Sequence, residues 1–267
     1  MKTILICHDG CPLDQVAMVR WLASFSTLSG LIVLRERKRD LWRRIRREFR
    51  RSGLLGFVDV VAFRLYYAAF LSRRDQQWQA QQIAQICKQY PPAPGDLPIL
   101  YTHSPNTTEV KSFIEGLRPD IMVARCKTLL RKEIFALASK GTFVFHPGIC
   151  PQYRNAHGCF WALVNRDLEN VGMSLLRIDK GVDTGPVYGY FSYPFDEGKE
   201  SHFVIQSRVV FENLDPLRVK LLEIYRGEAD PLDTAHRVSA SWGQPWLTSY
   251  IKWKAQARRH EVGVSRA

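Results

Sequence analysis

The sequence predicts an α/β fold in which a mostly parallel, twisted sheet is flanked by helices and carries a basic helical insertion. Short apolar runs bounded by turn residues alternate with stretches of helical periodicity, which is the pattern of strands joined by crossover helices. Polar residues follow directly after several of these runs, as they do at the carboxyl edge of such a sheet. With 267 residues, 46% of them hydrophobic, the chain is long enough for one domain of ordinary size and an appendage.

The first 34 residues predict the start of the sheet. A short apolar strand covers residues 1–10, a helix follows over about 12–29, and a second strand covers 31–34. Strand, helix and strand in this span indicate a right-handed parallel crossover. The apolar start is too brief for a signal peptide. The loop after the first strand has no G-x-G-x-x-G pattern, so the sequence gives no support to a nicotinamide or flavin cofactor.

Cysteine usage favours a reducing, cytoplasmic setting. The six cysteines include no C-x-x-C pair and show no zinc-like spacing. We therefore expect neither a disulfide framework nor a metal site.

Residues 35–51 change the character of the chain. They hold ten Lys or Arg and three acidic residues, a local excess of +7 within a net charge of +12. Apolar side chains recur among these charges at helical spacing, which predicts a basic amphipathic helix. They are Leu41, Trp42, Ile45 and Phe49. The next stretch, 54–71, is mostly apolar, but Asp59, Arg64 and the glycines at 53 and 56 argue against a transmembrane span.

The sequence leaves three interpretations of residues 35–71. The first is a helical hairpin that packs on the domain and keeps its arginines in water. The second is an anchor lying in the plane of an anionic membrane, since each Lys or Arg near such a surface contributes about 1 kcal/mol. The third, a nucleic-acid patch, is the weakest because stacking aromatics do not alternate with the arginines.

After the insertion the chain returns to the sheet. A polar helix over 73–89 ends at the proline-rich segment 90–96, and 97–101 predicts a strand. A helix then starts at Asn106, which we expect to be its N-cap, with Glu109 in the capping-box position. Another buried strand, 121–124, is followed by Arg125 and Lys127. These two cations would meet an anionic ligand at the edge of the sheet or lie on the surface.

The most informative stretch is residues 144–163, read together with residues 179–186. An apolar strand over 142–145 must stop after His146, because Pro147 follows. His146 therefore lies at the carboxyl end of a strand, on the same strand face as Val144. Asp183 belongs to a polar turn between the expected strands 171–178 and 187–193, so its carboxylate can reach the same crevice.

The C-terminal part predicts helices. Residues 200–226 have helical periodicity, interrupted at Pro216, and residues 227–267 are too short for an independent barrel domain. We therefore expect an α/β domain over 1–200, with the basic insertion at 36–95, and a C-terminal helical extension over 201–267.

The two motifs together resemble the signature of the folate-dependent formyltransferases. Residues 146–163 read HPGxCPxYRxAHGxxWAL, and residues 179–187 read DxGxDTGPV. That family includes phosphoribosylglycinamide, methionyl-tRNA and sugar-nucleotide formyltransferases, and the resemblance covers residues 95–195 well. It implies a Rossmann-like formyltransferase fold, 10-formyltetrahydrofolate as formyl donor, and His146 with Asp183 as catalytic residues.

These residues suit formyl transfer chemically. An amine attacks the formyl carbon, so one proton must leave the amine and another must reach the departing nitrogen. A histidine carries such protons near neutral pH, and a neighbouring carboxylate orients it and stabilises its charged form. We expect ligand contacts from further residues of the motifs and the preceding strand end. They are Arg125, Lys127, Pro147, Asn155, His157, Thr184 and Gly185.

One position departs from the resemblance. The family carries an asparagine two residues before the histidine, where this chain has Val144. Losing one hydrogen-bond donor to an oxyanion typically costs about 10² to 10³ in rate, and valine offers no donor. Asn155, His157 or a backbone amide of the following loop would have to supply one.

We therefore expect an enzyme that formylates the amine of a small acceptor, an amino sugar linked to a nucleotide or a lipid. The short C-terminal end speaks against a tRNA acceptor. Two alternatives stay open because of Val144: a catalytically inactive or altered binding protein, and a formyltetrahydrofolate hydrolase. We expect a cytoplasmic protein without a nucleic-acid partner. Peripheral attachment to the inner face of the membrane through 35–71 and a homodimer are left open.

Overall fold

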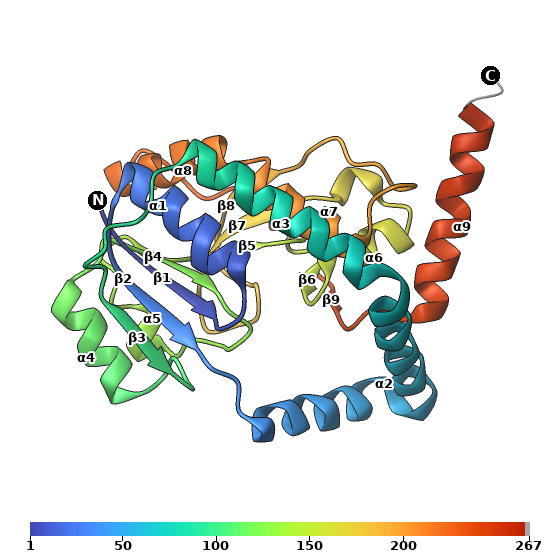
Figure 1. Ribbon diagram of the computed structural model, residues 1–267, viewed down its shortest axis with the longest axis horizontal. Coiled ribbons are helices and arrows are strands. Elements are labelled where there is room, and N and C mark those ends of the chain that lie inside the picture. The colour runs from blue at the N-terminus through green and yellow to red at the C-terminus, as the bar shows by residue number, and fades with distance from the viewer. Residues whose placement is uncertain (265–267) are drawn as a thin grey trace.

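The protein has an α/β fold built on a seven-stranded sheet, as the sequence predicts (Figure 1). The computed structural model describes residues 1–264, except the side chains of 38–41 and 260–264. The side chain of Leu41 and residues 265–267, which belong to the expected helix and extension, lie outside the described residues. In the sheet the strand order is β3-β2-β1-β4-β5-β7-β8.

The strands are β1 (Lys2–His8), β2 (Thr27–Leu34), β3 (Ile99–Thr102), β4 (Ile121–Arg125), β5 (Gly141–His146), β6 (Arg154–Asn155), β7 (Met173–Arg177), β8 (Val187–Phe191) and β9 (Ser241–Trp242). The helices of the first half are η1 (Leu13–Met18), α1 (Val19–Phe25), α2 (Lys38–Tyr66), η2 (Tyr67–Leu71), α3 (Ser72–Gln89), α4 (Thr108–Leu117) and α5 (Lys132–Phe135). Those of the second half are α6 (Gly158–Val164), η3 (Leu168–Asn170), α7 (His202–Phe211), α8 (Leu214–Arg226) and α9 (Leu247–Val264).

Strand direction places His146 at the carboxyl edge of the sheet, and the turn that contains Asp183 folds back to it. Strands β1 to β5 pair in parallel, whereas β7 pairs antiparallel with both β5 and β8. The carboxyl ends of the parallel strands therefore share one edge, and β5 ends there at His146. Because β7 runs antiparallel to β5, the turn between β7 and β8 begins near the amino end of β5, where the Ile178 amide donates to the Thr142 carbonyl at 2.7 Å. The turn then returns along the sheet, so that Asp183 lies 3.4 Å from His146 at the carboxyl edge.

Alternating side chains divide the core between the two faces of the sheet. Leu5, Val123 and Phe145 belong to a large cluster with residues of α1, α3, α6, α7 and α8. Ile4 and Met122 point to the opposite face, where they cluster with residues of α4 and α5. Figure 1 shows these helices on opposite sides of the sheet. Both faces are covered, which explains why the parallel strands read as continuous apolar runs.

Three expected boundaries were wrong. Strand β2 begins at Thr27 rather than at residue 31, because Lys2 and Thr3 pair with Thr27 and Leu28. Helix α4 is capped by Thr107, whose hydroxyl accepts a hydrogen bond from the Val110 amide at 3.3 Å. The C-terminal helices separate before Leu214, so the break lies before Pro216, which falls in the first turn of α8, where proline is tolerated.

Asn106, the expected cap of α4, has another structural role. Its amide nitrogen donates to the carbonyl of Leu129 at 2.9 Å, and its amide oxygen accepts from the backbone N–H of Arg131 at 2.8 Å. The side chain therefore ties the start of α4 to the loop after β4. Both Asn106 and Thr107 are good cap residues by type, so sequence alone does not separate them.

The basic insertion is helical, as predicted, and bends once. Gly53 interrupts α2 with φ 68°, a left-handed conformation that favours glycine. Phe49 and Phe57 meet across the bend with ring centroids 5.4 Å apart. Beyond the bend, η2 and α3 continue to Gln89 and return the chain to the sheet.

By length and composition, the helical stretch Trp42–Gln89 is apolar enough to cross a membrane. The expectation that residues 54–71 do not span a membrane stays a prediction, because length and composition alone do not test it. Core helices of soluble proteins pass the same test, but only 11% of the apolar window is buried here. The insertion thus exposes an unusual amount of apolar surface.

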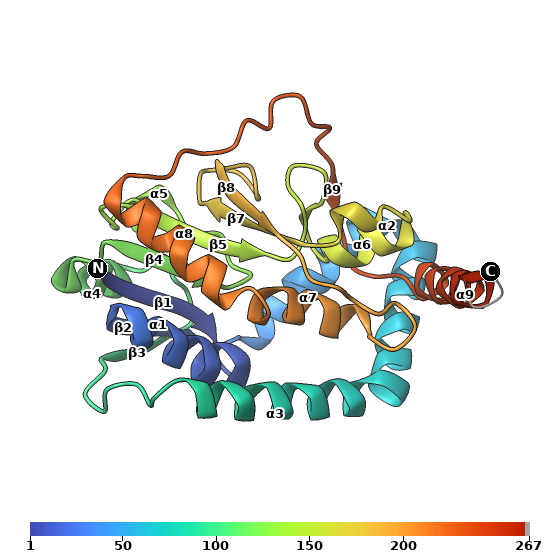
Figure 2. The same ribbon diagram turned by 90° about the horizontal axis from the view of Figure 1, so that it is seen from above.

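The C-terminal residues form a strap and a final helix. Residues 227–246 run along the β8 side of the sheet, as Figure 2 shows from above, and the Leu232 amide donates to the Val187 carbonyl at 2.7 Å. Helix α9 buries Tyr250, Trp253 and Ala257 and projects from the end of the molecule. The division at residue 200 stays a prediction.

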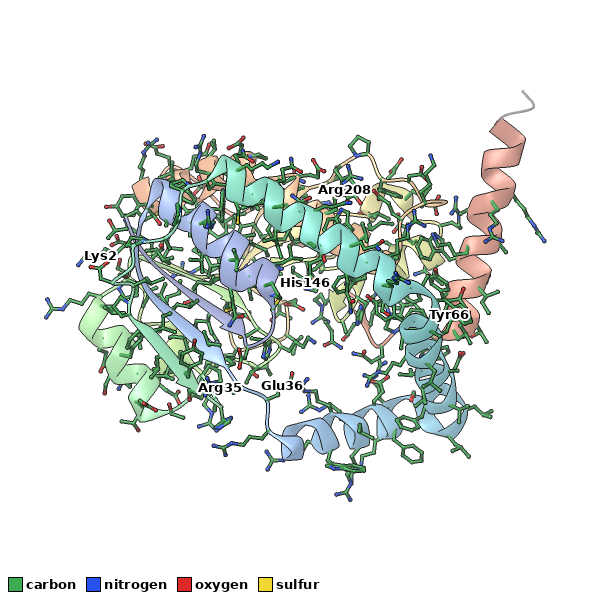
Figure 3. The ribbon with its side chains drawn as sticks, viewed as in Figure 1. Lys2, Arg35, Glu36, Tyr66, His146 and Arg208 are labelled. Carbon is green, nitrogen blue, oxygen red and sulfur yellow. The ribbon has the colours of Figure 1, made fainter. Side chains whose placement is uncertain are left out.

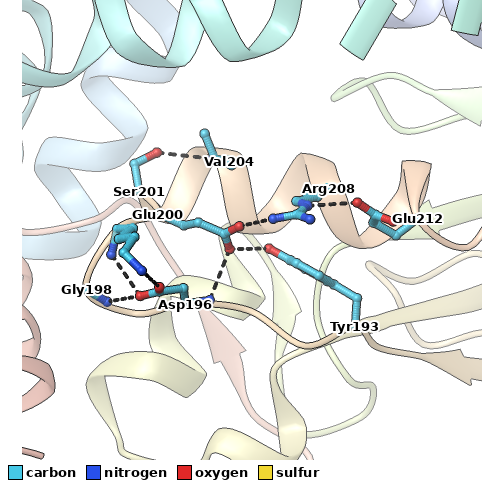
Figure 4. A network of polar contacts seen from close by, with 9 residues as sticks. Tyr193, Asp196, Gly198, Glu200, Ser201, Val204, Arg208 and Glu212 are labelled. Atoms are coloured by element: carbon cyan, nitrogen blue, oxygen red, sulfur yellow. Dashed lines mark hydrogen bonds and ion pairs between the residues drawn. The ribbon is translucent and has the colours of Figure 1, made fainter. Parts of the chain in front are cut away.

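A polar network fixes the entry into α7 (Figure 4). The Ser201 hydroxyl caps the helix by accepting from the Val204 amide at 3.1 Å, and it donates to the buried Asp75 carboxylate of α3 at 2.7 Å. The Glu200 carboxylate accepts from the Tyr193 hydroxyl at 2.7 Å and pairs with Arg208. The network sets the position of His202, the first residue of α7, next to the insertion.

Candidate active site

His146 is held at both ring nitrogens. It lies at the end of β5 and is 5% exposed. Its Nε2 is 2.8 Å from the Tyr153 carbonyl oxygen, and its Nδ1 is 3.4 Å from Asp183 Oδ2. The structure therefore brings together the two residues that the sequence predicts to be catalytic.

These contacts specify where a proton can be held. A carbonyl oxygen only accepts hydrogen bonds, so Nε2 donates to Tyr153 and carries a proton. In the neutral imidazole Nδ1 is then the basic nitrogen, and it faces the Asp183 carboxylate. A proton added to Nδ1 turns this contact into an ion pair, which is the behaviour that a proton carrier requires.

The turn between β7 and β8 presents Asp183 in a constrained conformation. Asp183 has φ 51°, in the left-handed region that costs non-glycine residues energy, and its Oδ2 accepts from the Asn155 amide at 2.8 Å. At the base of the turn, Asp179 Oδ1 accepts from the Thr184 hydroxyl at 2.8 Å. A Cβ on Gly185 would lie 1.9 Å from the Arg177 carbonyl oxygen, so this close approach requires glycine. Thr184 and Gly185 thus shape the turn that holds Asp183.

Two glycines let the loop after β5 fold back onto the imidazole. A Cβ on Gly148 would lie 2.5 Å from the Tyr153 carbonyl oxygen and 2.9 Å from Nε2 of His146. A Cβ on Gly158 would lie 2.6 Å from the Gly148 Cα. The backbones approach too closely for any side chain at either position. The carbonyl of Pro147 accepts from the Cys159 amide at 3.1 Å, which fixes the same crossing.

A small, open cleft of about 80 Å³ lies beside this pair. Asp183 and Val144 line it, and His146 lies behind Asp183. Its apolar wall comes from β4, β5, β7 and the segments after them: Ala124, Leu129, Leu130, Val144, Leu176 and Ile178. Arg177, Asp179 and Lys180 place charges around the opening. Val144 therefore faces the cleft.

Arg125 and Lys127 lie at the carboxyl edge of β4 but differ in environment. The Arg125 side chain is 15% exposed and donates to the buried Asp14 carboxylate at 2.9 Å and to the Phe145 carbonyl at 3.1 Å. Arg125 therefore fixes the end of β5 through its hydrogen bond to the Phe145 carbonyl. Lys127 is exposed, and its backbone amide donates to Nε2 of His8 at 3.0 Å.

The side chains of Asn155 and His157 are engaged elsewhere. The Asn155 amide nitrogen donates to the Trp242 carbonyl at 2.5 Å, so this residue meets Asp183 through its backbone. His157 Nδ1 lies 3.1 Å from the Gln206 side-chain oxygen. Burial, with a smaller contribution from Lys127, lowers the pKa of His157 to about 4. Neither side chain is placed to replace the donor that Val144 lacks.

The C-terminal strap holds the loop that contacts His146. The sequence did not predict this contact between the strap and the loop. Strand β9 pairs with β6, and the Trp242 indole stacks on Tyr153 with ring centroids 5.7 Å apart. The Trp242 Nε1 donates to the Gln152 carbonyl at 2.8 Å. Trp242 and Gln152 are 90 residues apart, so no local sequence pattern predicts their contact. The tryptophans near the C-terminal end indicated only that this end packs on the main body.

Cysteines of the site are poor nucleophiles at neutral pH. Burial raises the pKa of the Cys150 thiol to about 12 and that of Cys126, which lines the cleft, to about 11. All six cysteines are free thiols. Among the described residues, no group of three or more His, Cys, Asp or Glu side chains could hold a metal ion. The polar groups available to a reactant are thus those of the Asp183 turn and the cleft opening.

Comparison with known proteins places these features in a family. The sequence model of the formyl transferase family matches residues 69–213, more than half of the chain. Methionyl-tRNA formyltransferase of Sorangium cellulosum is 31% identical over 125 residues, which are 44% of this chain and 40% of that protein. The enzyme of the same name from Thermus thermophilus is 34% identical over 102 residues, 37% of this chain and 32% of that protein. This chain therefore spans less than half the length of these relatives.

Solved structures support the same fold over a larger part of the chain. A sugar N-formyltransferase from Shewanella sp. FDAARGOS_354 aligns with 91% of this chain and 77% of its own, with TM-score 0.53 and 13% identity. Phosphoribosylglycinamide formyltransferase from Anaplasma phagocytophilum aligns with 92% of this chain and 99% of its own, with TM-score 0.53 and 9% identity. With both motifs, the sheet and the family match in agreement, the chain belongs to the formyl transferase family.

Proposed function

We propose that this protein transfers a formyl group from 10-formyltetrahydrofolate to the amine of a small acceptor, an amino sugar linked to a nucleotide or a lipid. The observation that carries the proposal is the contact of His146 with Asp183 beside the cleft. Family membership supports the reaction class. The amino-sugar acceptor is carried over from the Shewanella sugar N-formyltransferase, which aligns with 91% of this chain.

The cleft has the chemistry that a folate donor needs. Leu130, Val144 and Leu176 offer an apolar wall for a flat heterocycle, while Arg177 and Lys180 offer cations for an anionic tail. When bound there, the donor would supply the formyl group.

We assign the proton transfers to this chain's own residues. Asp183, which lines the cleft, takes the proton of the attacking amine and passes it to Nδ1 of His146, while Nε2–H stays bonded to Tyr153. The same proton then returns through Asp183 to the departing nitrogen of the donor, so that the transfer is balanced. Asp183 stabilises the resulting imidazolium, and the Asn155 amide keeps the carboxylate in place. The His146 side chain is largely buried, which limits competing proton exchange with bulk water.

A turnover assay tests the proposal. Purified protein is incubated with 10-formyltetrahydrofolate and a panel of amino-sugar nucleotides, and tetrahydrofolate release is measured. We expect release that requires an acceptor, and a decrease in kcat of about 10² or more in His146→Gln and Asp183→Asn. The exposed His103→Gln is a matched control that should keep wild-type kcat. Full activity of both site variants would contradict the assignment.

Val144 favours a second candidate, a formyltransferase-like protein that binds the donor without transferring its formyl group. The valine lines the cleft and gives no oxyanion donor. The same assay separates the candidates: binding of the donor without release indicates the inactive protein, and release without acceptor indicates a hydrolase. We place the protein in the cytoplasm, a setting that suits its six free thiols.

A further inference from the structure

The insertion presents an apolar face that no other part of the described chain covers. We call it the outer face of α2 and define it as Leu54, Leu55, Val58, Val61 and Leu65 of α2 together with Phe70 of the adjoining η2. Five of these side chains are more than half exposed: Leu54 65%, Leu55 86%, Val58 57%, Leu65 67% and Phe70 72%. Their spacing places Leu54, Val58, Val61 and Leu65 along one side of the helix. A contiguous apolar surface of this kind is uncommon on soluble proteins and indicates an interaction site.

The opposite side of the same helix packs against the rest of the protein. Val60 and Phe63 are 2% and 5% exposed, and the Phe63 ring lies 5.3 Å from the His202 ring of α7. Asp59 accepts a hydrogen bond from the Thr248 amide at 3.1 Å, and Arg64 lies 3.5 Å from the Gln244 side-chain oxygen. The two charged residues of the apolar stretch thus face the C-terminal segment. The outer face itself carries no charged residue.

Arginines adjoin the outer face across the bend at Gly53. Arg46, Arg47 and Arg50 are exposed and form no ion pair with a described residue. In the same half of α2, the side chains of Trp42 and Phe49 are 70% and 43% exposed. The bend places this basic, aromatic segment at an angle to the apolar segment (Figure 1). Anionic phosphates beside hydrocarbon are the chemical environment that such a pair of segments complements.

We propose that the outer face of α2 and the adjoining arginines dock the protein in the plane of an anionic lipid membrane. A second copy of this chain is a poorer occupant, because residues 35–51 carry a local charge of +7 in each copy. A nucleic acid would leave the aliphatic side chains in water. A helix that spans the membrane would expose to lipid the side on which Val60 and Phe63 are buried and Asp59 accepts a hydrogen bond from Thr248. The proposal does not depend on the formyl transfer reaction.

The position of the insertion gives docking a consequence for the cleft. The chain leaves β2 at Leu34 and enters α2 through Arg35 and Glu36, at the carboxyl edge of the parallel strands. Figure 3 labels these two residues with His146, which ends β5 at the same edge. Attachment through α2 would therefore hold the edge that carries the active site at a fixed orientation to the membrane.

Vesicle sedimentation tests the docking surface. The full chain is mixed with phosphatidylcholine vesicles prepared with and without phosphatidylglycerol, at low and at high salt. We expect binding to the anionic vesicles at low salt, and release at high salt because the arginine contribution is screened. Binding at least tenfold weaker is expected for Arg46→Glu with Arg47→Glu, and separately for Leu55→Glu with Leu65→Glu.

Matched controls keep the test specific. Val219→Glu adds a charge on α8 at a side chain that is 51% exposed, and Arg226→Glu reverses the charge of a side chain that is 58% exposed. Both variants should bind the vesicles as the wild type does. All substituted positions are exposed, so thermal melts should remain at the wild-type value. Absence of vesicle binding at low salt would overturn the proposal. So would wild-type binding by the Leu55 and Leu65 variant, a dimer that this variant dissociates without any vesicle binding, or retention in the membrane after alkaline carbonate extraction.

Discussion

At the scale of single residues, the site depends on how His146 is bound rather than on its presence alone. The Tyr153 carbonyl fixes the proton on Nε2, and Asp183 faces the remaining nitrogen. Asp183 holds a left-handed backbone conformation that an aspartate adopts only at a cost. Such strain is maintained when the surrounding contacts require it. Here the turn at Asp179 and the Asn155 amide supply those contacts.

Val144 gives the clearest prediction at this scale. Its side chain lines the cleft and contacts the Leu176 cluster, so an amide at this position would reach the cleft as well. If transfer is limited by a missing oxyanion donor, Val144→Asn should raise kcat by about tenfold to 10²-fold. Steady-state kinetics of tetrahydrofolate release provide the measurement. Val144→Leu, which adds volume without a donor, should show no increase.

An unchanged kcat in a folded Val144→Asn protein would mean that another donor already serves the oxyanion. The side chains of Asn155 and His157 are poor candidates, because they are bonded to Trp242 and Gln206. A backbone amide of the loop would then be the remaining choice. Donor affinity should be measured in parallel, since an amide in a partly apolar cleft can also change binding.

The sequence predicted the residues of the site better than their environment. The proline after His146 and the alternation of β5 were sufficient to place the imidazole at the sheet edge and Val144 on the cleft side. The contact of His146 with the Tyr153 carbonyl was not predictable, because every residue carries a backbone carbonyl and the residue type therefore gives no signal. Burial of Arg125 against Asp14 was missed for a similar reason: the partners are 111 residues apart.

At the scale of elements, the loop after β5 folds back on itself because Gly148 and Gly158, the first residue of α6, approach at van der Waals contact. We predict that Gly148→Ala lowers the free energy of unfolding by about 1 to 3 kcal/mol, because the new methyl group must displace the Tyr153 carbonyl. The same displacement removes the acceptor of His146, so kcat should fall as well. Denaturant unfolding and the turnover assay measure the two effects.

A second glycine serves as the control for this prediction. Gly116 lies within α4 and would place a Cβ in open space, so Gly116→Ala should stabilise the protein by up to about 1 kcal/mol without changing kcat. Equal stability of the Gly148 and Gly116 variants would show that the crossing is not as close as the structure indicates.

Local patterns predicted most elements but not those that depend on distant partners. The basic helix, the helix over 73–89 and the strands β4 and β5 follow from periodicity and turn residues. Strand β2 starts early because Lys2 and Thr3 provide pairing partners for Thr27 and Leu28, which the sequence pattern assigned to the end of the preceding helix. The two-residue strands β6 and β9 have no pattern of their own, and they exist because the strap pairs with the loop. In each case a tertiary contact outweighs local preference.

At the scale of the whole molecule, an aromatic cluster joins the insertion to the core. The His202 ring of α7 lies 5.3 Å from both Phe63 of α2 and Phe160 of α6, and 6.4 Å from Tyr250 of α9. His157 approaches from the other side at 5.8 Å. Four helices therefore meet around one buried imidazole. His202 Nδ1 has no hydrogen-bond partner among the described residues.

This cluster makes stability depend on pH. Burial, together with the charges of His157 and Lys254, lowers the pKa of His202 well below its usual value, and burial and Lys127 lower the pKa of His157 to about 4. Both histidines are therefore neutral in the fold, whereas in the unfolded chain they protonate near pH 6.5. Their contribution is complete above about pH 6.5 and is lost as the pH falls towards 4. Each histidine contributes up to about 1.4 kcal/mol per pH unit to the decrease in the free energy of unfolding.

We predict that replacing His202 by phenylalanine weakens this dependence. The ring would stay within the aromatic cluster, and the proton uptake that favours unfolding would be removed, so His202→Phe should lose less stability than wild type between about pH 7 and pH 4.5. Urea unfolding at a series of pH values measures the slope. The exposed His236→Gln should keep the wild-type slope. A parallel curve for His202→Phe would show that His202 is not the titrating group at the junction, and acid unfolding would then have to begin elsewhere.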